Sequence, residues 1–93
     1  MNLTTQATDN PDVMKFVADR TLNPGAPKAF YDAESARADP FAADIFAIEG
    51  VGGLFIINEF LRVKKHEAAS WNDLIPKIES AVRRHWGGET HEV

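Results

Sequence analysis

The sequence predicts an α+β fold in which a small, mainly antiparallel sheet carries two helices, both packed on one of its faces. Short β-prone segments bounded by turn residues alternate with two stretches of helical periodicity, which gives the expected order β-β-α-β-β-α. The chain has 93 residues, and dividing it would leave two cores too small to be stable. We therefore expect one sheet and one core.

Two short β-prone segments open the chain. Residues 3–8 (LTTQAT) run into the turn cluster Asp9-Asn10-Pro11, where Asn and Asp side chains cap the backbone and proline restricts φ. The mostly apolar segment Val13–Val17 follows at once, and Asn23-Pro24-Gly25 forms the next predicted turn. Because the first connection is so short, we expect these two strands to pair antiparallel.

The spacing of apolar residues changes to a period of 3.6 between Asp32 and Ile48, which predicts a helical region. Asp39-Pro40 interrupts this region, since proline at a first helical position after an aspartate is a helix start signal. We expect a short turn, then a fresh helix from Pro40 that ends at Glu49-Gly50.

Residues 51–65 have the pattern of a β-hairpin around the polar pair Asn58-Glu59. The second arm alternates cleanly, so Leu61 and Val63 are expected to face the core. The same alternation points three residues outward: Phe60, Arg62 and Lys64. Five other aromatics fall on apolar stripes and are expected in the core: Phe16, Phe41, Phe46, Phe55 and Trp71.

The last helix is predicted to begin at Ser70, whose hydroxyl can cap it while Asp73 completes a capping-box pair. Pro76 conflicts with this start, because proline removes a helical hydrogen bond; it either kinks the helix or moves its start by two or three residues. Gly87-Gly88 ends the helix, and residues 89–93 are expected to form a flexible tail. Residues 1–88 are therefore predicted to form the single domain.

Composition argues against several classes of function. The chain contains no cysteine, which excludes disulfides, thiolate nucleophiles and clusters or zinc held by cysteine within it. The net charge is −4, and the longest basic clusters, Lys64-Lys65 and Arg83-Arg84, are too short for binding to duplex nucleic acid. There is no membrane-spanning or secretory pattern, so a cytoplasmic location is expected.

No motif predicts an enzyme or a bound cofactor. His66, His85 and His91 lack the spacing of metal ligands and are expected on the surface. The glycines of Gly50-x-Gly52-Gly53 leave a helix and enter a strand, which is the reverse of the order in phosphate-binding loops. No serine lies in a nucleophile motif.

Several motifs distributed over residues 3–86 nevertheless point to one known family. They are Thr5-x-x-Thr8-x-Asn10-Pro11 with Met14-Lys15-Phe16, Asp39-Pro40-Phe41-Ala42 through Ile45-Phe46-x-Ile48-x-Gly50-Val51, Phe60-Leu61-x-Val63-x-Lys65, and Trp71-x-x-Leu74-x-Pro76. In this combination the chain resembles the N-terminal domain of the Nfu (NifU-like) iron–sulfur cluster scaffold proteins. In two-domain members a second domain supplies the cluster-binding C-x-x-C, which is missing here. The resemblance implies a stand-alone relative of the accessory half.

An outward aromatic side chain beside cations is typical of a protein-contact surface, and Lys15 is expected on the same side as Phe60. The competing interpretation of Phe60 is partial burial by a neighbouring loop. With the resemblance, this surface predicts a non-enzymatic interaction module of iron–sulfur cluster biogenesis. Its partner is expected to be an acidic or thiol-bearing protein, either a scaffold carrying a C-x-x-C domain or a client apoprotein. The predicted partner-binding residues are Thr8, Asn10, Pro11, Lys15, Phe60, Arg62 and Lys64.

Two alternative functions stay open. The first is weak carriage of iron or another metal through Asp, Glu and His ligands, for which Glu89, His91 and Glu92 form the only local grouping in the sequence. The second is stacking of single-stranded nucleic acid on Phe60, which needs more aromatic side chains on an open sheet than the sequence indicates. Neither a nucleic-acid nor a membrane partner is predicted.

Overall fold

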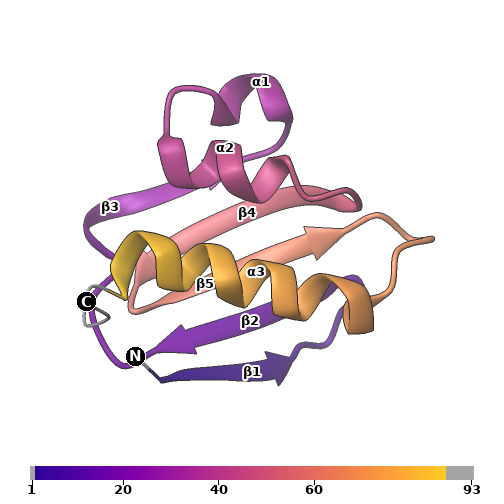
Figure 1. Cartoon of the computed structure of the whole chain (residues 1–93), viewed down its shortest axis with the longest axis horizontal. Helices are drawn as coiled ribbons and strands as arrows, with labels where there is room; N and C mark the ends of the chain where they lie inside the picture. Colours follow the sequence, from indigo (N-terminus) through magenta and orange to yellow (C-terminus); the bar gives the residue numbers. More distant parts are fainter. Residues whose placement is uncertain (1, 88–93) are drawn as a thin grey trace.

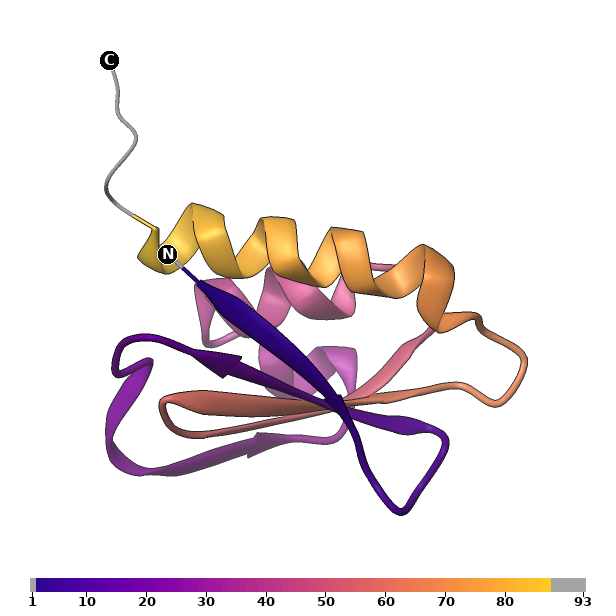
Figure 2. The same cartoon turned by 90° about the horizontal axis from the view of Figure 1, so that it is seen from below.

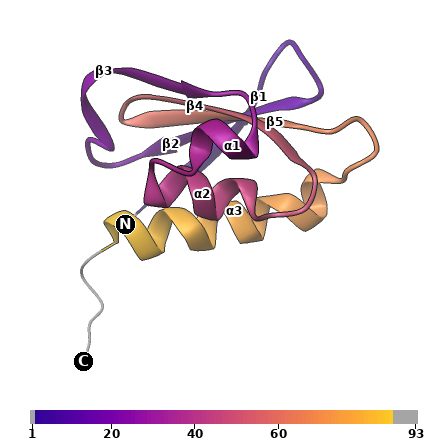
Figure 3. The same ribbon diagram turned by 90° about the horizontal axis from the view of Figure 1, so that it is seen from above.

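Five strands and three helices occupy the part of the chain that the computed structural model describes, residues 2–87 (Figure 1). In chain order they are β1 (Leu3–Ala7), β2 (Val13–Ala18), β3 (Asn23–Phe30), α1 (Ala33–Ala36), α2 (Pro40–Phe46), β4 (Val51–Asn58), β5 (Phe60–Lys65) and α3 (Trp71–Trp86). The strands form one antiparallel sheet in the order β1-β2-β5-β4-β3. All three helices lie against the same face (Figures 2 and 3). The predicted fold class is confirmed.

The core lies between the sheet and the helices. Leu61 and Val63 of β5 are fully buried, as the alternation predicted, and they meet the inner sides of α2 and α3. Burying an aliphatic side chain of this size contributes about 1.5–3 kcal/mol, so this layer provides most of the stability. The largest side chains with no exposed surface are Phe16, Ile45, Leu61, Leu74, Ile78, Val63 and Val82.

The two helical regions begin where their capping residues predicted. The Asp39 carboxylate accepts hydrogen bonds from the amides of Phe41 (3.0 Å) and Ala42 (3.1 Å), and Pro40 follows it as the first residue of α2. The Ser70 hydroxyl accepts from the Asn72 amide (3.2 Å), so α3 starts at Trp71. Pro76 is accommodated inside α3 on its exposed side, where water can reach the carbonyl that loses its helical donor. The helix ends at Trp86 with Gly87 as its cap; the predicted tail lies outside the described residues.

β3 corrects the predicted element order. The sequence predicted a turn at Asn23-Pro24-Gly25 and no strand there, whereas Asn23–Phe30 forms an edge strand paired with β4. The pairing skips from Asn23 to Lys28, so both prolines lie in a bulge and withdraw no ladder hydrogen bond. The buried Asn23 side chain stabilises the bulge by donating to the Ala26 carbonyl (2.7 Å).

Phe55 corrects the predicted core. It pairs with Arg62 across the β4–β5 ladder and is half-buried on the face opposite the helices, whereas its neighbours Leu54 and Ile56 are buried beneath them. Successive residues of a strand point to opposite faces, so Phe55 has to face away from the core once Leu54 and Ile56 face into it.

Candidate interaction surface

One face of the sheet carries no helix of the described chain (Figure 2). We call this surface the open face. The antiparallel registers align the outward residues of neighbouring strands in rows across it. Its outward positions are Thr4, Gln6, Val13, Lys15, Val17, Ala29, Gly53, Phe55, Ile57, Phe60, Arg62 and Lys64. The open face therefore combines apolar and cationic side chains, and these positions include no acid.

Phe60 lies under two cations. The Lys15 ammonium nitrogen is 4.3 Å from the centroid of its ring, and the Arg62 guanidinium carbon is 5.5 Å from it. Each contact is a cation–π interaction, of the kind that contributes roughly 0.5–1 kcal/mol at exposed sites. Phe60 is half-buried, in part because these two side chains cover its ring. We call Lys15, Phe60, Arg62 and Lys64 the Phe60 patch.

The sheet concentrates positive charge on a chain whose net charge is −4. The five strands contain five basic residues and no Asp or Glu. Lys28 pairs with Asp39 (3.2 Å) and Lys65 pairs with Asp12 (2.9 Å). Within residues 2–87 the other three strand cations, all in the Phe60 patch, have no carboxylate partner: Lys15, Arg62 and Lys64.

The predicted site residues of the first turn hold that turn together. The Thr8 hydroxyl lies 2.9 Å from the carbonyls of both Asn10 and Val13, and it accepts from the Asn10 amide (3.1 Å). The Asn10 side chain accepts from the Asp12 amide (2.9 Å), and the Pro11 carbonyl accepts from a Trp71 ring N–H (2.9 Å). The family motif at Thr8, Asn10 and Pro11 thus has a structural role.

The turn and Phe60 lie at different ends of β5. Val13, the first residue of β2 after the turn, pairs with Lys64, whereas Val17 pairs with Phe60 at the far end. The structure therefore brings Lys15, Phe60 and Arg62 into contact and places the turn beside Lys64. Asn10 and Pro11 are exposed at this rim of the open face.

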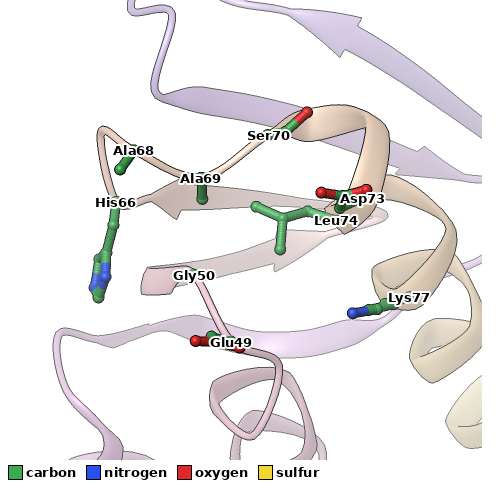
Figure 4. A pocket seen from close by; sticks show the side chains of 9 residues that line it. All are labelled: Glu49, Gly50, His66, Ala68, Ala69, Ser70, Asp73, Leu74 and Lys77. Atoms are coloured by element: carbon green, nitrogen blue, oxygen red, sulfur yellow. The ribbon is translucent and has the colours of Figure 1, made fainter.

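A separate hollow of about 410 Å³ lies at the start of α3 (Figure 4). Glu49, His66, Asp73 and Lys77 are in its wall, with His66 and Asp73 at opposite ends. Among the described residues no group of three His, Asp or Glu side chains is close enough to hold a metal ion. The Glu89, His91 and Glu92 grouping lies outside the described residues.

His85 connects two helices. Its Nε2 is 2.7 Å from an Asp44 carboxylate oxygen of α2, and its ring meets the Phe41 ring edge-on at 5.3 Å. The hydrogen bond to His85 lowers the pKa of the Asp44 carboxyl. His85 therefore has a structural role, joining α3 to α2.

Tyr31 and Phe55 are surface residues to which sequence reasoning gave no role in binding. Tyr31 follows β3 directly and is 80% exposed, and it shares a groove with Phe55 on the open face. Tyr31 could have been identified as a surface residue from the sequence, because it lies between the end of a strand and Asp32, a helix-capping aspartate. Phe55 had no such signal, because β4 is apolar on both faces.

The fold and this surface define a small α+β module with one cationic, aromatic sheet face left open. The chain belongs to the family described as "Scaffold protein Nfu/NifU N terminal", whose pattern matches residues 3–88. In residues 2–87 no helix has the length and apolar character needed to cross a membrane.

Curated relatives match this chain over only part of their own length. The chain is 32% identical over 83 residues to the mitochondrial NFU1 iron–sulfur cluster scaffold homolog of Drosophila erecta, covering 88% of this chain and 29% of that protein. It is 33% identical over 82 residues to the mitochondrial NifU-like protein 4 of Arabidopsis thaliana, with the same coverage of both. The chain therefore spans about 29% of the length of these relatives.

Solved structures share the fold. The solution structure of a NifU-like protein from Saccharomyces cerevisiae aligns with a TM-score of 0.81 at 23% identity, covering 96% of this chain and 82% of that one. The crystal structure of a Staphylococcus aureus protein aligns with a TM-score of 0.74 at 24% identity, covering 88% of this chain and 99% of that one. Both likenesses support the five-stranded α+β architecture.

Proposed function

We propose that the chain is a non-enzymatic accessory module of iron–sulfur cluster biogenesis that acts by binding a protein partner through its open face. The observation that carries this proposal is the cationic, aromatic Phe60 patch on an otherwise acidic member of the Nfu/NifU N-terminal family. The relatives in Drosophila and Arabidopsis are named as scaffold and NifU-like proteins, which supports the choice of pathway.

The partner in this proposal is an acidic protein of the pathway, either a scaffold with a C-x-x-C domain or a client apoprotein. Because this chain has no cysteine, it holds no cluster through thiolates and contributes by contact alone. The unpaired cations attract carboxylates, and Phe60 provides apolar area that is removed from water on binding. The turn with Thr8, Asn10 and Pro11 extends the contact at the Lys64 rim.

The place of action is also part of the proposal. The sequence predicts a cytoplasmic location, whereas the matched Drosophila and Arabidopsis relatives carry the word mitochondrial in their names. The contact mechanism is the same in either compartment, because it depends on the open face alone.

The test is affinity purification of the tagged chain from its native cells, followed by quantitative mass spectrometry. We expect enrichment of proteins of iron–sulfur cluster assembly, including one with a C-x-x-C scaffold domain, and at least a fivefold loss of that enrichment in Phe60→Ala. Lys77→Ala is the control variant, because it changes an exposed residue of α3 on the opposite side of the molecule. An absence of such proteins, or their equal recovery with Phe60→Ala, contradicts the proposal.

A further inference from the structure

A groove of about 460 Å³ on the open face overlaps the Phe60 patch, with which it shares two cations. Its lining includes Gly52, Gly53, Tyr31 and Phe55, together with two cations. We call this feature the Tyr31 groove, and its cations are Arg62 and Lys64. Its volume is within the range of about 300–1,000 Å³ that is typical of small ligand sites.

A β-bulge and a missing side chain create the groove. The β4–β5 register moves from Val51–Lys65 to Gly53–Lys64, so Gly52 is an extra residue in β4. Tyr31 follows Phe30, which pairs with Leu54, and it therefore lies beside Gly53. A Cβ atom on Gly53 would lie 3.3 Å from the Lys64 Cβ. The absence of that atom leaves the space between Tyr31 and Lys64 open.

The walls present apolar surface that nothing in the described chain covers. Tyr31 is the large hydrophobic residue with the greatest exposure, 80%, and Phe55 in the same lining is half-buried. Exposed aromatics of this kind mark contact sites, because they gain large apolar area on binding at low entropic cost. The apolar lining therefore favours an apolar side chain of the partner, which would act as an anchor.

The cations of the Tyr31 groove determine which charge a partner should carry beside that anchor. Arg62 and Lys64 have no carboxylate partner among residues 2–87, and the strand positions around them carry no acid. Unpaired cations beside an apolar groove favour carboxylates that flank an apolar side chain. A polyanion such as nucleic acid fits less well, because the chain carries a net charge of −4 and the open face offers only three cations.

We propose that the Tyr31 groove takes one aromatic or branched aliphatic side chain of an acidic partner segment, whose flanking carboxylates pair with Arg62 and Lys64. This inference rests on the proposed function, since it assumes that an acidic protein docks on the open face. It goes further by naming the sequence feature that the face recognises. It also assigns the anchor to Tyr31 and Gly53 rather than to Phe60.

The test titrates the isotope-labelled chain with the peptide acetyl-Glu-Asp-Phe-Asp-Glu-amide. Binding is followed through the amide chemical shifts of the chain. We expect saturable shifts centred on Tyr31, Gly53 and Phe55, with a Kd of roughly 0.1–1 mM for so short a segment. Replacing the peptide's Phe with Ala is expected to weaken binding at least fivefold. Tyr31→Ala should do the same, and it should leave the fold intact because the side chain is so exposed.

Two controls separate this site from general attraction to the open face. Thr4→Ala changes an exposed outward residue of β1 on the same face and should leave the Kd unchanged. Decathymidylate offers negative charge and bases in place of carboxylates, and we expect it to bind more weakly than the peptide. Equal binding by Tyr31→Ala, equal binding of the Ala peptide, or tighter binding of decathymidylate overturns the inference.

The two proposals fail independently. If Phe60→Ala abolishes recovery of cluster-assembly proteins but the peptide does not bind the groove, the inference is wrong and the proposed function stands. If the peptide binds through Tyr31 but no cluster-assembly protein is recovered, the groove is a peptide site and the assigned pathway is wrong.

Discussion

At the scale of single residues, Lys65 shows how a family motif can be structural. Its side chain is 10% exposed, and its ammonium group pairs with Asp12 (2.9 Å) and donates to the Glu67 carbonyl (3.2 Å). The Lys65 amide also donates to the Asp12 carbonyl (2.8 Å). These bonds join the end of β5 to the first turn, so Lys65 determines how that turn sits beside the open face.

Lys65→Met keeps the aliphatic stem and removes the charge. We expect a loss of about 2 kcal/mol in the free energy of unfolding, because Asp12 and a loop carbonyl both lose a partly buried donor. Urea denaturation followed by circular dichroism measures it. Lys64→Met is the control on the same strand, and as a surface change it should stay within about 0.5 kcal/mol. Equal effects of the two variants would contradict a structural role for Lys65.

The lowered pKa of the Asp39 carboxyl predicts that stability depends on pH. Partial burial disfavours its charge, but the Ala42 amide, the Lys28 ammonium group and the Phe41 amide together hold its pKa below the ordinary value. A carboxyl whose folded pKa is depressed stabilises the fold fully above its unfolded pKa, roughly 3.9, and that stabilisation is lost as the pH falls through the folded value. The Asp39 contribution should therefore disappear in acid.

Asp39→Asn keeps an N-cap acceptor and removes the titration. Urea unfolding between about pH 5 and pH 2 should show a shallower decline in stability for this variant than for the parent chain. Lys28→Met removes one of the interactions that lower the pKa, so its curve should fall between the two. A decline as steep as that of the parent chain would show that Asp39 does not contribute.

At the scale of elements, the β4–β5 hairpin and the helix starts could be predicted because their signals are local. Alternation in β5, the Ser70 cap and the Asp39-Pro40 start each depend on a few neighbouring residues. β3 could not be predicted in this way. Its Pro24, Gly25 and Pro27 are turn residues, and they fit a strand only because β3 lies at the sheet edge and bulges there, which is a property of the tertiary structure.

The candidate site was predictable to the extent that it depends on β5. Phe60 and Arg62 follow from alternation within one strand, and Lys15 follows once β2 pairs with β5. The Tyr31 groove depends instead on a bulge in β4 and on a neighbouring strand that the sequence did not predict. Local sequence patterns do not predict the pairing of two such irregular strands.

The connection from α2 to β4 depends on Gly50. Its φ of 105° lies in a region that residues with side chains rarely adopt, and a Cβ there would come within 2.9 Å of the Ala69 Cβ. Gly50→Ala should therefore cost about 2–4 kcal/mol, measured by thermal or urea unfolding. Gly25→Ala, with no atom within 4 Å of its new Cβ, should change stability by less than about 1 kcal/mol. A mild effect at Gly50 would contradict the strained turn.

At the scale of the whole molecule, the distribution of charged residues differs between the sheet and the helical layer. All 12 acidic residues among residues 2–87 lie outside the strands, whereas five of the ten Lys and Arg residues of the same range lie within them. The acids of the described helices and their caps, such as Asp39, Asp44 and Asp73, belong to the helical layer. α3 also carries Lys77, Arg83 and Arg84, so the helical layer is mixed in charge, whereas the strands carry cations and no acid. A partner with a negative surface is therefore attracted mainly by the open face, which orients the encounter before contact.

This orientation predicts a salt dependence that distinguishes the two layers. Raising NaCl from about 25 to 250 mM should weaken binding of the acidic peptide roughly three- to tenfold, because screening shortens the reach of the three cations. Lys64→Ala should weaken binding at low salt and flatten this dependence, whereas Lys77→Ala on α3 should change neither. Fluorescence anisotropy of a labelled peptide measures both. If binding does not change with salt, the Tyr31 groove acts through its apolar walls alone, and the cations of the open face have no part in recognition.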